Sequence, residues 1–310
     1  MKRRSFARLR RIATRIPTYF ADAVDNPEWL VMFALGRVMP VRRAYRRFRA
    51  VPAPIPTVER TIFATRDAAA IATTVRTDGI RPALDLPEAI TREIHDFALA
   101  TPCYGNMDRR LEFLAPDHGA AEQQFGRPLL TGHYFDRVEQ CPAMTTVRQD
   151  PLLHAVAAAY LGPRVRLAAA RLWWSFPTRP REEDLHLASQ DRFHFDLDDW
   201  QTLKFFFYLT DVDERAGPHV YIRGSHRQRL WRHQLTLLVG QPTDEVVAAY
   251  GARNVLSVMG EAGYGFAEDP FGFHMGTAPR ATPRLMMEIA FGVSAASRRR
   301  FYGEPVVGLK

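Results

Sequence analysis

The chain has few cysteines and lacks the signatures of several large enzyme classes. Only Cys103 and Cys141 are present among 310 residues, which excludes a disulfide scaffold and a cysteine-based zinc site. A GxGxxG motif, a Walker loop and a GxSxG elbow are all missing. Their absence argues against nucleotide-binding folds and serine hydrolases.

Long apolar runs are missing as well. The most apolar stretch, from Trp29 to Leu35, is far shorter than the roughly 20 residues that span a bilayer. Free thiols and the lack of a spanning segment predict a cytoplasmic protein. Hydrophobic residues still make up 46% of the chain, which excludes general disorder and is enough for the core of one large domain or two smaller ones.

Positive charge is concentrated at one end of the chain. The formal net charge is +8, but residues 1–50 contain 13 Lys and Arg against three acidic residues, so the rest of the chain is slightly acidic. Phe6, Leu9, Ile12 and Ile16 recur among these arginines at helical spacing, which predicts a basic amphipathic helix.

Two interpretations of this basic arm stay open. Residues 1–50 can make a peripheral contact with an anionic membrane or an acidic partner, or the helix can pack its apolar stripe on its own domain. Nucleic acid is the weaker candidate partner, because the near-neutral body has no recognisable module that combines aromatic and basic residues.

A proline-rich segment, Val51 to Pro56, predicts a stiff spacer between the arm and the body of the protein. We therefore expect a partly helical arm and one following domain with three parts. The expected limits are 1–58 for the arm, 59–310 for the domain, and within it 59–164 for a helical part, 165–293 for a β core and 294–310 for a basic tail.

The sequence pattern changes after Gly162. Before it, helices are predicted from Pro87 and from Pro151; after it, five short strands and one inserted helix are predicted. The strands are expected at 165–174, 202–209, 219–222, 263–266 and 284–291, and the helix at 242–250. Short, evenly spaced strands predict a sandwich or barrel. The turn-rich stretches 101–140 and 178–192 predict loops that shape a substrate pocket.

The triplet His194-Phe195-Asp196 is the most informative short motif. On an extended segment the first and third side chains point to the same side, so His194 and Asp196 can share one ligand. One imidazole and one carboxylate, joined by a second histidine, make the facial triad of non-haem Fe(II) oxygenases. Taken alone, such a triplet is weak evidence, and a surface turn explains it better.

The surrounding residues make the triplet more specific. It lies in the segment 193–200, which is followed by Leu203 to Asp213, then by Gly217 to Arg227 with its Gly-Ser-His-Arg turn, and then by Phe273-His-Met-Gly276. This order resembles the phytanoyl-CoA dioxygenase family of Fe(II)/2-oxoglutarate oxygenases over roughly residues 150–293. The resemblance implies a mainly β fold: a double-stranded β-helix core, jelly-roll or cupin-like, with N-terminal helices.

The resemblance also implies roles for single residues. His194, Asp196 and His274 correspond to the catalytic iron ligands, and Arg284 to the arginine that pairs with the distal carboxylate of 2-oxoglutarate. Gly276 stands where some members have a hydroxyl residue that helps to hold this co-substrate, and Thr277 can substitute for it.

Two further expectations concern the strands around this site. Phe206 shares one strand face with Lys204 and Tyr208, and the family pattern directs that face toward the co-substrate. The turn-rich stretch 278–283 predicts that His274 and Arg284 lie on neighbouring antiparallel strands, about 4.8 Å apart.

The implied activity is that of an Fe(II)- and 2-oxoglutarate-dependent dioxygenase. It would use dioxygen to hydroxylate a C–H bond of a small-molecule or lipid-like substrate and release succinate and CO₂. Related halogenases lack the carboxylate, so Asp196 favours hydroxylation. The alternative is a non-catalytic β-sandwich binding protein that its basic arm tethers to a membrane or an acidic polymer.

Overall fold

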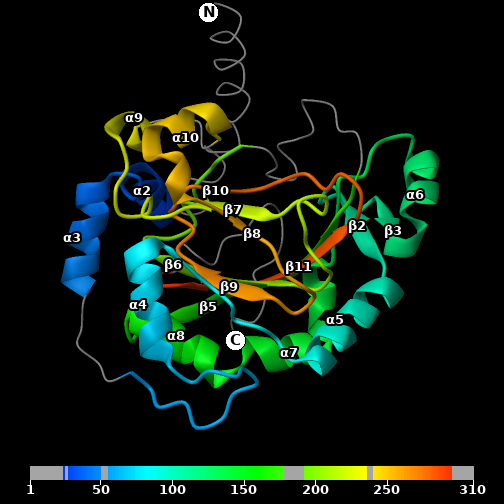
Figure 1. The fold of residues 1–310 in the computed structure, drawn as a ribbon, viewed down its shortest axis with the longest axis horizontal. Helices are drawn as coiled ribbons and strands as arrows, with labels where there is room; N and C mark the ends of the chain where they lie inside the picture. The colour runs from blue at the N-terminus through cyan, green and yellow to red at the C-terminus, as the bar shows by residue number, and fades with distance from the viewer. Residues whose placement is uncertain (1–23, 25–26, 50–54, 178–191, 236–239, 295–310) are drawn as a thin grey trace, which may run out of the picture.

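The framework of the protein is a pair of antiparallel β-sheets that lie face to face (Figure 1). The computed structural model describes residue 24 and residues 27–49, 55–177, 192–235 and 240–294. The large sheet has eight strands in the order β1-β9-β6-β11-β5-β4-β2-β3, and the small sheet has three in the order β10-β7-β8.

The second half of the chain alternates between the two sheets. The large sheet contains β1 (Ile80–Pro82), β2 (Cys103–Gly105), β3 (Glu112–Phe113), β4 (Thr131–His133), β5 (Arg166–Ser175), β6 (Thr202–Tyr208), β9 (Gly265–Glu268) and β11 (Arg284–Gly292). The small sheet contains β7 (His219–Ile222), β8 (Val255–Val258) and β10 (His274–Gly276). This winding is that of a double-stranded β-helix, which confirms the predicted fold class.

Helices cover the outside of the large sheet and the edges of the molecule. They are α2 (Pro27–Leu35), α3 (Met39–Arg49), α4 (Ala68–Asp78), α5 (Glu88–Ala100), α6 (His118–Phe125), α7 (Pro142–Arg148), α8 (Pro151–Leu161), α9 (Trp231–Gln234) and α10 (Thr243–Tyr250). The described residues also form three short 3₁₀ helices: η1 (Ala115–Asp117), η2 (Phe135–Gln140) and η4 (Ala252–Asn254). Figure 1 shows α4, α5, α7 and α8 gathered on the side of the large sheet that faces away from the small one.

Local sequence signals set the limits of these helices. The Asp150 carboxylate accepts a hydrogen bond from the Leu152 amide at 2.8 Å and so caps α8, and Pro151 fits its first turn. Gly162 ends the helix with a φ of 97°, a conformation that side chains other than glycine rarely adopt. The three helices predicted from Pro87, Pro151 and Pro242 are all present as α5, α8 and α10.

The outward face of the large sheet forms the main hydrophobic core. Phe205 and Phe207 of β6 are fully buried there, and their rings lie 5.9 Å from Phe291 and 5.8 Å from Phe63, respectively. Burying one such side chain contributes about 1.5–3 kcal/mol to folding. This face therefore fixes the sheet against the helices and leaves the opposite face free for other chemistry.

Part of the basic arm packs on the β core. Tyr45 of α3 stacks on Trp200 with ring centroids 4.6 Å apart, and the Met39 amide donates to the Gln234 side chain at 2.8 Å. Arg42 donates to the Asp199 carbonyl at 3.4 Å. The amphipathic segment predicted at 6–16 lies outside the described residues, as does the basic tail 295–310.

One stretch differs from its prediction. Residues 101–140 were expected to be loops, and this was wrong: they contain β2, β3 and β4, with α6 between them. Strands of two or three residues are too short to show the alternation by which a strand is recognised in a sequence. The second predicted loop, 178–192, lies almost wholly outside the described residues.

In the part of the chain that is described, none of the helices has the length and apolar character needed to cross a membrane.

Candidate metal centre

Two segments that are 80 residues apart bring the predicted ligands together. The extended segment at His194 and the first residue of β10, His274, form an antiparallel bridge. The His194 amide donates to the His274 carbonyl and the His274 amide to the His194 carbonyl, both at 2.9 Å. This pair of backbone bonds fixes the separation of the two imidazoles independently of any ion.

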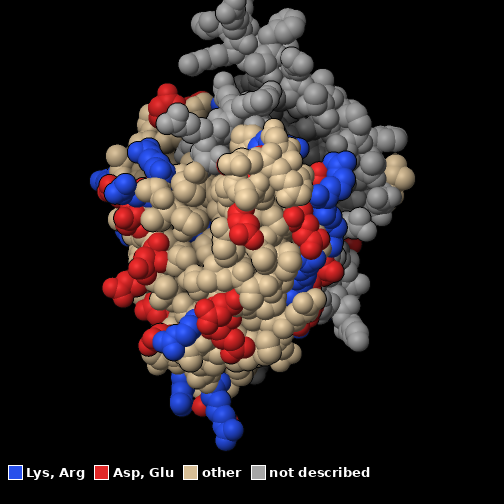
Figure 2. All heavy atoms as spheres, turned by 90° about the vertical axis from the view of Figure 1, so that its right-hand side faces the viewer, with Lys and Arg blue, Asp and Glu red and all other residues tan. Residues whose placement is uncertain are grey.

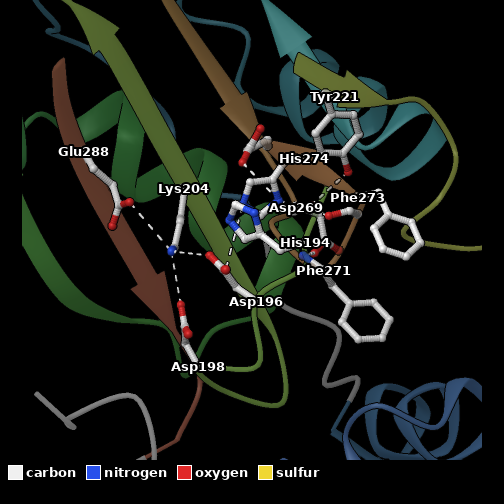
Figure 3. Close-up of polar contacts among 12 residues, drawn as sticks. His194, Asp196, Asp198, Lys204, Tyr221, Asp269, Phe271, Phe273, His274 and Glu288 are labelled. Atoms are coloured by element: carbon white, nitrogen blue, oxygen red, sulfur yellow. Dashed lines mark hydrogen bonds and ion pairs between the residues drawn. The ribbon is translucent and has the colours of Figure 1, made fainter. Parts of the chain in front are cut away.

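The three side chains meet on one side of this bridge. One ligand atom each of His194, Asp196 and His274 lies within 4.8 Å of the others, so the group could hold a metal ion. The two imidazole centroids are 4.3 Å apart, and Asp196 Oδ1 is 3.8 Å from His274 Nε2. Figure 3 shows the three side chains pointing toward one another.

Backbone carbonyls orient both imidazoles. His194 Nδ1 lies 3.1 Å from the Arg192 carbonyl, and His274 Nδ1 lies 3.0 Å from the Gly272 carbonyl. A hydrogen bond to a carbonyl requires the proton on Nδ1, which leaves Nε2 of each ring with a free lone pair. This arrangement is typical of histidines that bind a metal through Nε2.

The charge states of the triad also suit a cation. Burial is the main cause that lowers the pKa of His274 to about 4, and it lowers the pKa of His194 as well, so both rings are neutral at pH 7. Burial opposes ionisation of Asp196, but Lys204 and the two histidines outweigh it and hold the pKa of this carboxyl below its ordinary value. Two neutral imidazoles and one carboxylate result.

Lys204 of β6 connects three carboxylates beneath the triad (Figure 3). Its Nζ lies 2.6 Å from Asp196 Oδ2, 3.1 Å from Asp198 Oδ2 and 3.7 Å from Glu288 Oε2. Arg171 donates to both oxygens of Glu288, which completes a buried network. Because Lys204 binds Oδ2 of Asp196, it directs Oδ1 toward the imidazoles.

A second buried pair closes the site from the other side. His219 of β7 lies 2.8 Å from Glu268 of β9, so this contact joins the two sheets, and the His219 ring lies 5.6 Å from that of His274. Burial raises the pKa of Glu268 to about 8 and lowers that of His219 to about 3. A neutral carboxylic acid can donate to a neutral imidazole through Oε2, whereas Oε1 of Glu268 has no hydrogen-bond partner in the described structure.

Arg284, at the start of β11, is a buried cation with spare hydrogen-bonding capacity. It is 3% exposed, and its Nη2 donates to the Ser175 hydroxyl at 3.3 Å. Its Nε and Nη1 have no hydrogen-bond partner in the described structure, and burial lowers its pKa. Unpaired guanidinium N–H groups at such depth are costly and indicate room for an anionic partner.

The predicted placement of Arg284 beside His274 on a neighbouring strand was wrong. β10 pairs with β7 in the small sheet, whereas β11 pairs with β5 and β6 in the large sheet. The chain crosses from one sheet to the other between these strands, so the two residues face each other across the interior. A Cβ built on Gly276 would lie 3.4 Å from Arg284 Nη2, so the guanidinium approaches β10 two residues beyond His274.

The remaining predicted site residues lie in different surroundings. Phe206 is buried on the inward face of β6, where its ring stacks on Phe266 at 5.3 Å and on His219 at 5.5 Å. The Thr277 hydroxyl donates to the Pro218 carbonyl at 2.7 Å, so its proton is engaged by the backbone. Ser175 is the residue whose hydroxyl contacts Arg284.

Two hydroxyl residues near Arg284, namely Ser175 and Thr131, were not predicted from the sequence. Thr131, Ser175 and Arg284 are direct partners across β4, β5 and β11, so their side chains share the inward face. The buried Thr131 hydroxyl has no hydrogen-bond partner in the described structure. The strand β4, which carries Thr131, is one that the sequence pattern did not indicate.

Comparison with known proteins supports the fold. The chain matches no protein-family model and no curated relative. The crystal structure of EctD from S. alaskensis with bound Fe has 17% identity and a TM-score of 0.51, and the match covers 83% of this chain and 92% of that one. The apo form of the same protein has 19% identity and a TM-score of 0.50, covering 78% and 85%.

The epimerase SnoN, in complex with Fe³⁺, alpha ketoglutarate and nogalamycin RO, has 16% identity and a TM-score of 0.49, covering 72% of this chain and 82% of that one. At these identities, the likeness to the two EctD structures shows a common fold. It agrees with the double-stranded β-helix read from the strand order.

Proposed function

We propose that the protein is an Fe(II)- and 2-oxoglutarate-dependent dioxygenase of the phytanoyl-CoA dioxygenase type, which hydroxylates a C–H bond of a small-molecule or lipid-like substrate. The observation that carries the proposal is the common interior position of the ligand triad and an unsatisfied arginine. The structure of this protein's neighbour EctD from S. alaskensis contains bound Fe, which is consistent with a metal ion at this triad.

The donor set of the triad fits ferrous iron. Two neutral imidazoles and one carboxylate leave open positions on a six-coordinate ion, as non-haem Fe(II) enzymes require. We assign His194, Asp196 and His274 as the ligands, with Lys204 holding the second oxygen of Asp196. When bound, iron and 2-oxoglutarate supply the oxidising chemistry: the keto acid becomes succinate and CO₂, and dioxygen provides the hydroxyl oxygen.

The row of Arg284, Ser175 and Thr131 fits the distal carboxylate of 2-oxoglutarate. A guanidinium binds a carboxylate through two parallel N–H groups, and the Nε and Nη1 of Arg284, which have no partner, each form such a pair with Nη2. Arg284 Nη2 approaches Gly276 of β10, which lies two residues beyond His274. Two residues of an extended strand span about 6.6 Å, which is close to the length of a five-carbon diacid. We assign Ser175 rather than Thr277 as the hydroxyl that assists it.

The inward aromatic residues exclude water from this space. Phe206 and Phe266 are buried and stack on each other beside His219. A dry pocket strengthens the interaction of Arg284 with an anion and orients the co-substrate relative to the triad. We therefore assign Phe206 as a co-substrate-lining residue.

The direct test is an anaerobic titration of the Fe(II) protein with 2-oxoglutarate, which should produce the visible charge-transfer band of the chelate. With dioxygen, the same protein should convert 2-oxoglutarate to succinate. If Fe(II) binds but 2-oxoglutarate produces neither the band nor succinate, the dioxygenase assignment is wrong. If neither binds, the alternative of a non-catalytic β-sandwich binding protein is favoured.

Three sequence predictions remain untested beside this proposal. The division into an arm at 1–58 and one oxygenase domain at 59–310 stays a prediction. So do the cytoplasmic location and a peripheral membrane contact through residues 1–50, of which the amphipathic segment predicted at 6–16 lies outside the described residues.

A further inference from the structure

A cavity of about 420 Å³ lies between α3 and the Gly-Ser-His-Arg turn that follows β7. It is within the size range of small-molecule sites. Arginines and one histidine dominate its lining, which consists of Met39, Arg42, Arg43, Arg46, His226, Arg227 and Gln228. We call it the arginine pocket.

The positive charge of this pocket is incompletely balanced. Asp269 is the carboxylate that contacts one of its arginines, at 3.5 Å from Arg46 Nη2, and it also accepts from the Tyr160 hydroxyl at 2.6 Å. In the described structure, no ion pair is formed by Arg42, Arg43 or Arg227. Four guanidinium groups therefore surround one cavity with a single carboxylate among them.

The arginines on the other side of the molecule are paired differently. Arg109, Arg137 and Arg148 bind Asp136, Glu112 and Glu139 at 2.7, 2.9 and 2.6 Å. Figure 2 shows charges of both signs intermingled around an uncharged centre on the side that carries α5 and α6. The arginine pocket differs from this side of the molecule because it gathers four guanidinium groups around one cavity.

The pocket is built on ordered contacts. Arg42 is 4% exposed, and its guanidinium lies 3.9 Å from the centroid of the Phe271 ring. Arg43 Nη2 donates to the Arg227 carbonyl at 2.7 Å, and Arg46 Nη2 donates to the Tyr160 hydroxyl at 2.9 Å. Side chains that are already held in place lose little entropy when an anion binds.

The arginine pocket lies behind the triad. Phe195 sits between the two ligands His194 and Asp196 in the chain and points the other way, where its ring lies 5.6 Å from Phe271. Arg42 covers Phe271, so a phenylalanine layer separates the pocket from the imidazoles. A ligand here occupies a site distinct from that proposed for 2-oxoglutarate.

We propose that the arginine pocket binds the phosphate group of a phosphate ester. Guanidinium groups match the geometry of phosphate oxygens through paired N–H donors, and several can share one dianion. The cavity is larger than a single phosphate ion requires and so leaves room for the esterified group. The phosphate can belong to a soluble metabolite or to a lipid headgroup, which present the same chemistry.

The test uses the full-length metal-free protein, so its outcome does not depend on iron or 2-oxoglutarate. Glycerol 3-phosphate and inorganic phosphate are titrated by calorimetry, and flotation is measured with phosphatidylcholine vesicles with and without phosphatidate. The pocket variant is Arg43→Gln with Arg227→Gln, both at exposed positions. The control variant is Arg47→Gln with Arg223→Gln, which removes two exposed arginines from the same helix and turn but outside the pocket lining.

Each pocket arginine is expected to contribute about tenfold to the affinity, so the pocket variant should bind about 100-fold more weakly and the control variant almost normally. Loss of glycerol 3-phosphate binding in the pocket variant alone supports a soluble ester. Flotation with phosphatidate only, lost in the same variant, supports a lipid headgroup. Equal binding by the two variants, or no binding of any probe by the wild type, overturns the proposal. Thermal unfolding of each variant verifies that it is folded.

Discussion

The two faces of the large sheet are made from alternate residues of the same strands, yet their chemistry is opposite. Outward, Phe205, Phe207 and Ile289 are fully buried among helices. Inward, Lys204 and Glu288 belong to an ionic network at comparable depth. Apolar burial stabilises the fold, whereas buried ions contribute little net stability and restrict geometry. The difference separates the residues that hold the barrel together from those that shape its interior.

The largest expected effect comes from removing one of the proposed metal ligands on the inward side. His274→Ala should lose Fe(II) binding and reduce succinate formation to background, because two ligands cannot hold the ion in a fixed geometry. His154→Ala is the control: His154 packs against Phe291 on the outward side, and its variant should keep both properties. Metal content and succinate are measured, and equal loss in both variants would contradict the assignment.

The adjacent residues Phe206 and Phe207 provide the sharpest comparison of the two faces. Phe207→Ala should lower the free energy of unfolding by about 3–5 kcal/mol through lost burial and the cavity it leaves, with Fe(II) and 2-oxoglutarate binding retained by the folded protein. Phe206→Ala should also destabilise, but it should weaken 2-oxoglutarate binding. Denaturant unfolding and calorimetry measure these effects, and intact co-substrate affinity in Phe206→Ala would remove its proposed role.

Arg284→Gln is expected to weaken 2-oxoglutarate binding about 100-fold while Fe(II) affinity changes little, because the guanidinium supplies charge and two N–H donors to the distal carboxylate. Arg280→Gln, in the turn just before β11 and exposed, should leave both affinities unchanged. Calorimetric titration of the two variants with Fe(II) and with 2-oxoglutarate measures both affinities. Unchanged 2-oxoglutarate affinity in Arg284→Gln would reject the contact.

Lys204→Met tests whether the ionic network orients the metal ligands. The substitution removes the Lys204 cation and its contact to Asp196 Oδ2, so Fe(II) should bind about tenfold more weakly. Arg171→Met removes the ion pair with Glu288 and leaves the contact between Lys204 and Asp196 in place, so it should weaken Fe(II) binding less. Fe(II) titrations of both variants measure this, and the reverse order would show that Lys204 does not position Asp196.

The smallest expected effect concerns two adjacent carboxyl groups. Burial raises the pKa of Glu268 inside the barrel, whereas at Asp269 burial is outweighed by Arg46, His226 and Arg42, and the pKa lies below its ordinary value. A carboxyl with a lowered folded-state pKa stabilises the fold above the unfolded pKa of about 3.9, and this contribution is lost as the pH falls through the folded value.

Asp269→Asn should therefore lower the melting temperature most near pH 7, and the difference from the wild type should shrink below about pH 4. Melting temperatures measured between pH 7 and pH 3 test this. A difference that stays constant over the whole range would show that the ionised form of Asp269 does not contribute to stability.

The sequence predicted the fold class and the grouping of His194, Asp196 and His274 better than the strand pairing around them. That these three residues bind iron stays a prediction. His194 and Asp196 stand two residues apart in one motif, so a local pattern indicated them, whereas His274 was indicated by the resemblance to the phytanoyl-CoA dioxygenase family. The structure brings the three side chains together. The contacts of Lys204 with Asp196 and Glu288 depend on strand pairing, which no local pattern determines. Ser175 could be recognised only once its pairing with Arg284 was known.

Strand pairing also explains the errors. His274 and Arg284 are separated by a turn of the kind that joins hairpins, but the chain uses it to change sheets. The pattern of strand-forming residues bounded by Gly, Pro and Asp turns located β5, β6 and β11, which have seven to ten residues each. It could not locate β3 or β4, where two or three residues pair mainly because neighbouring strands present free hydrogen-bonding groups.

The main-chain bridge between His194 and His274 has a practical consequence. Because main-chain hydrogen bonds already join the two histidine-bearing segments, the proposed metal site can form without the ion, and the ion is not needed to stabilise the fold. Chelators should therefore remove the metal without unfolding the protein. Cobalt or nickel should then bind the triad as spectroscopic substitutes for iron.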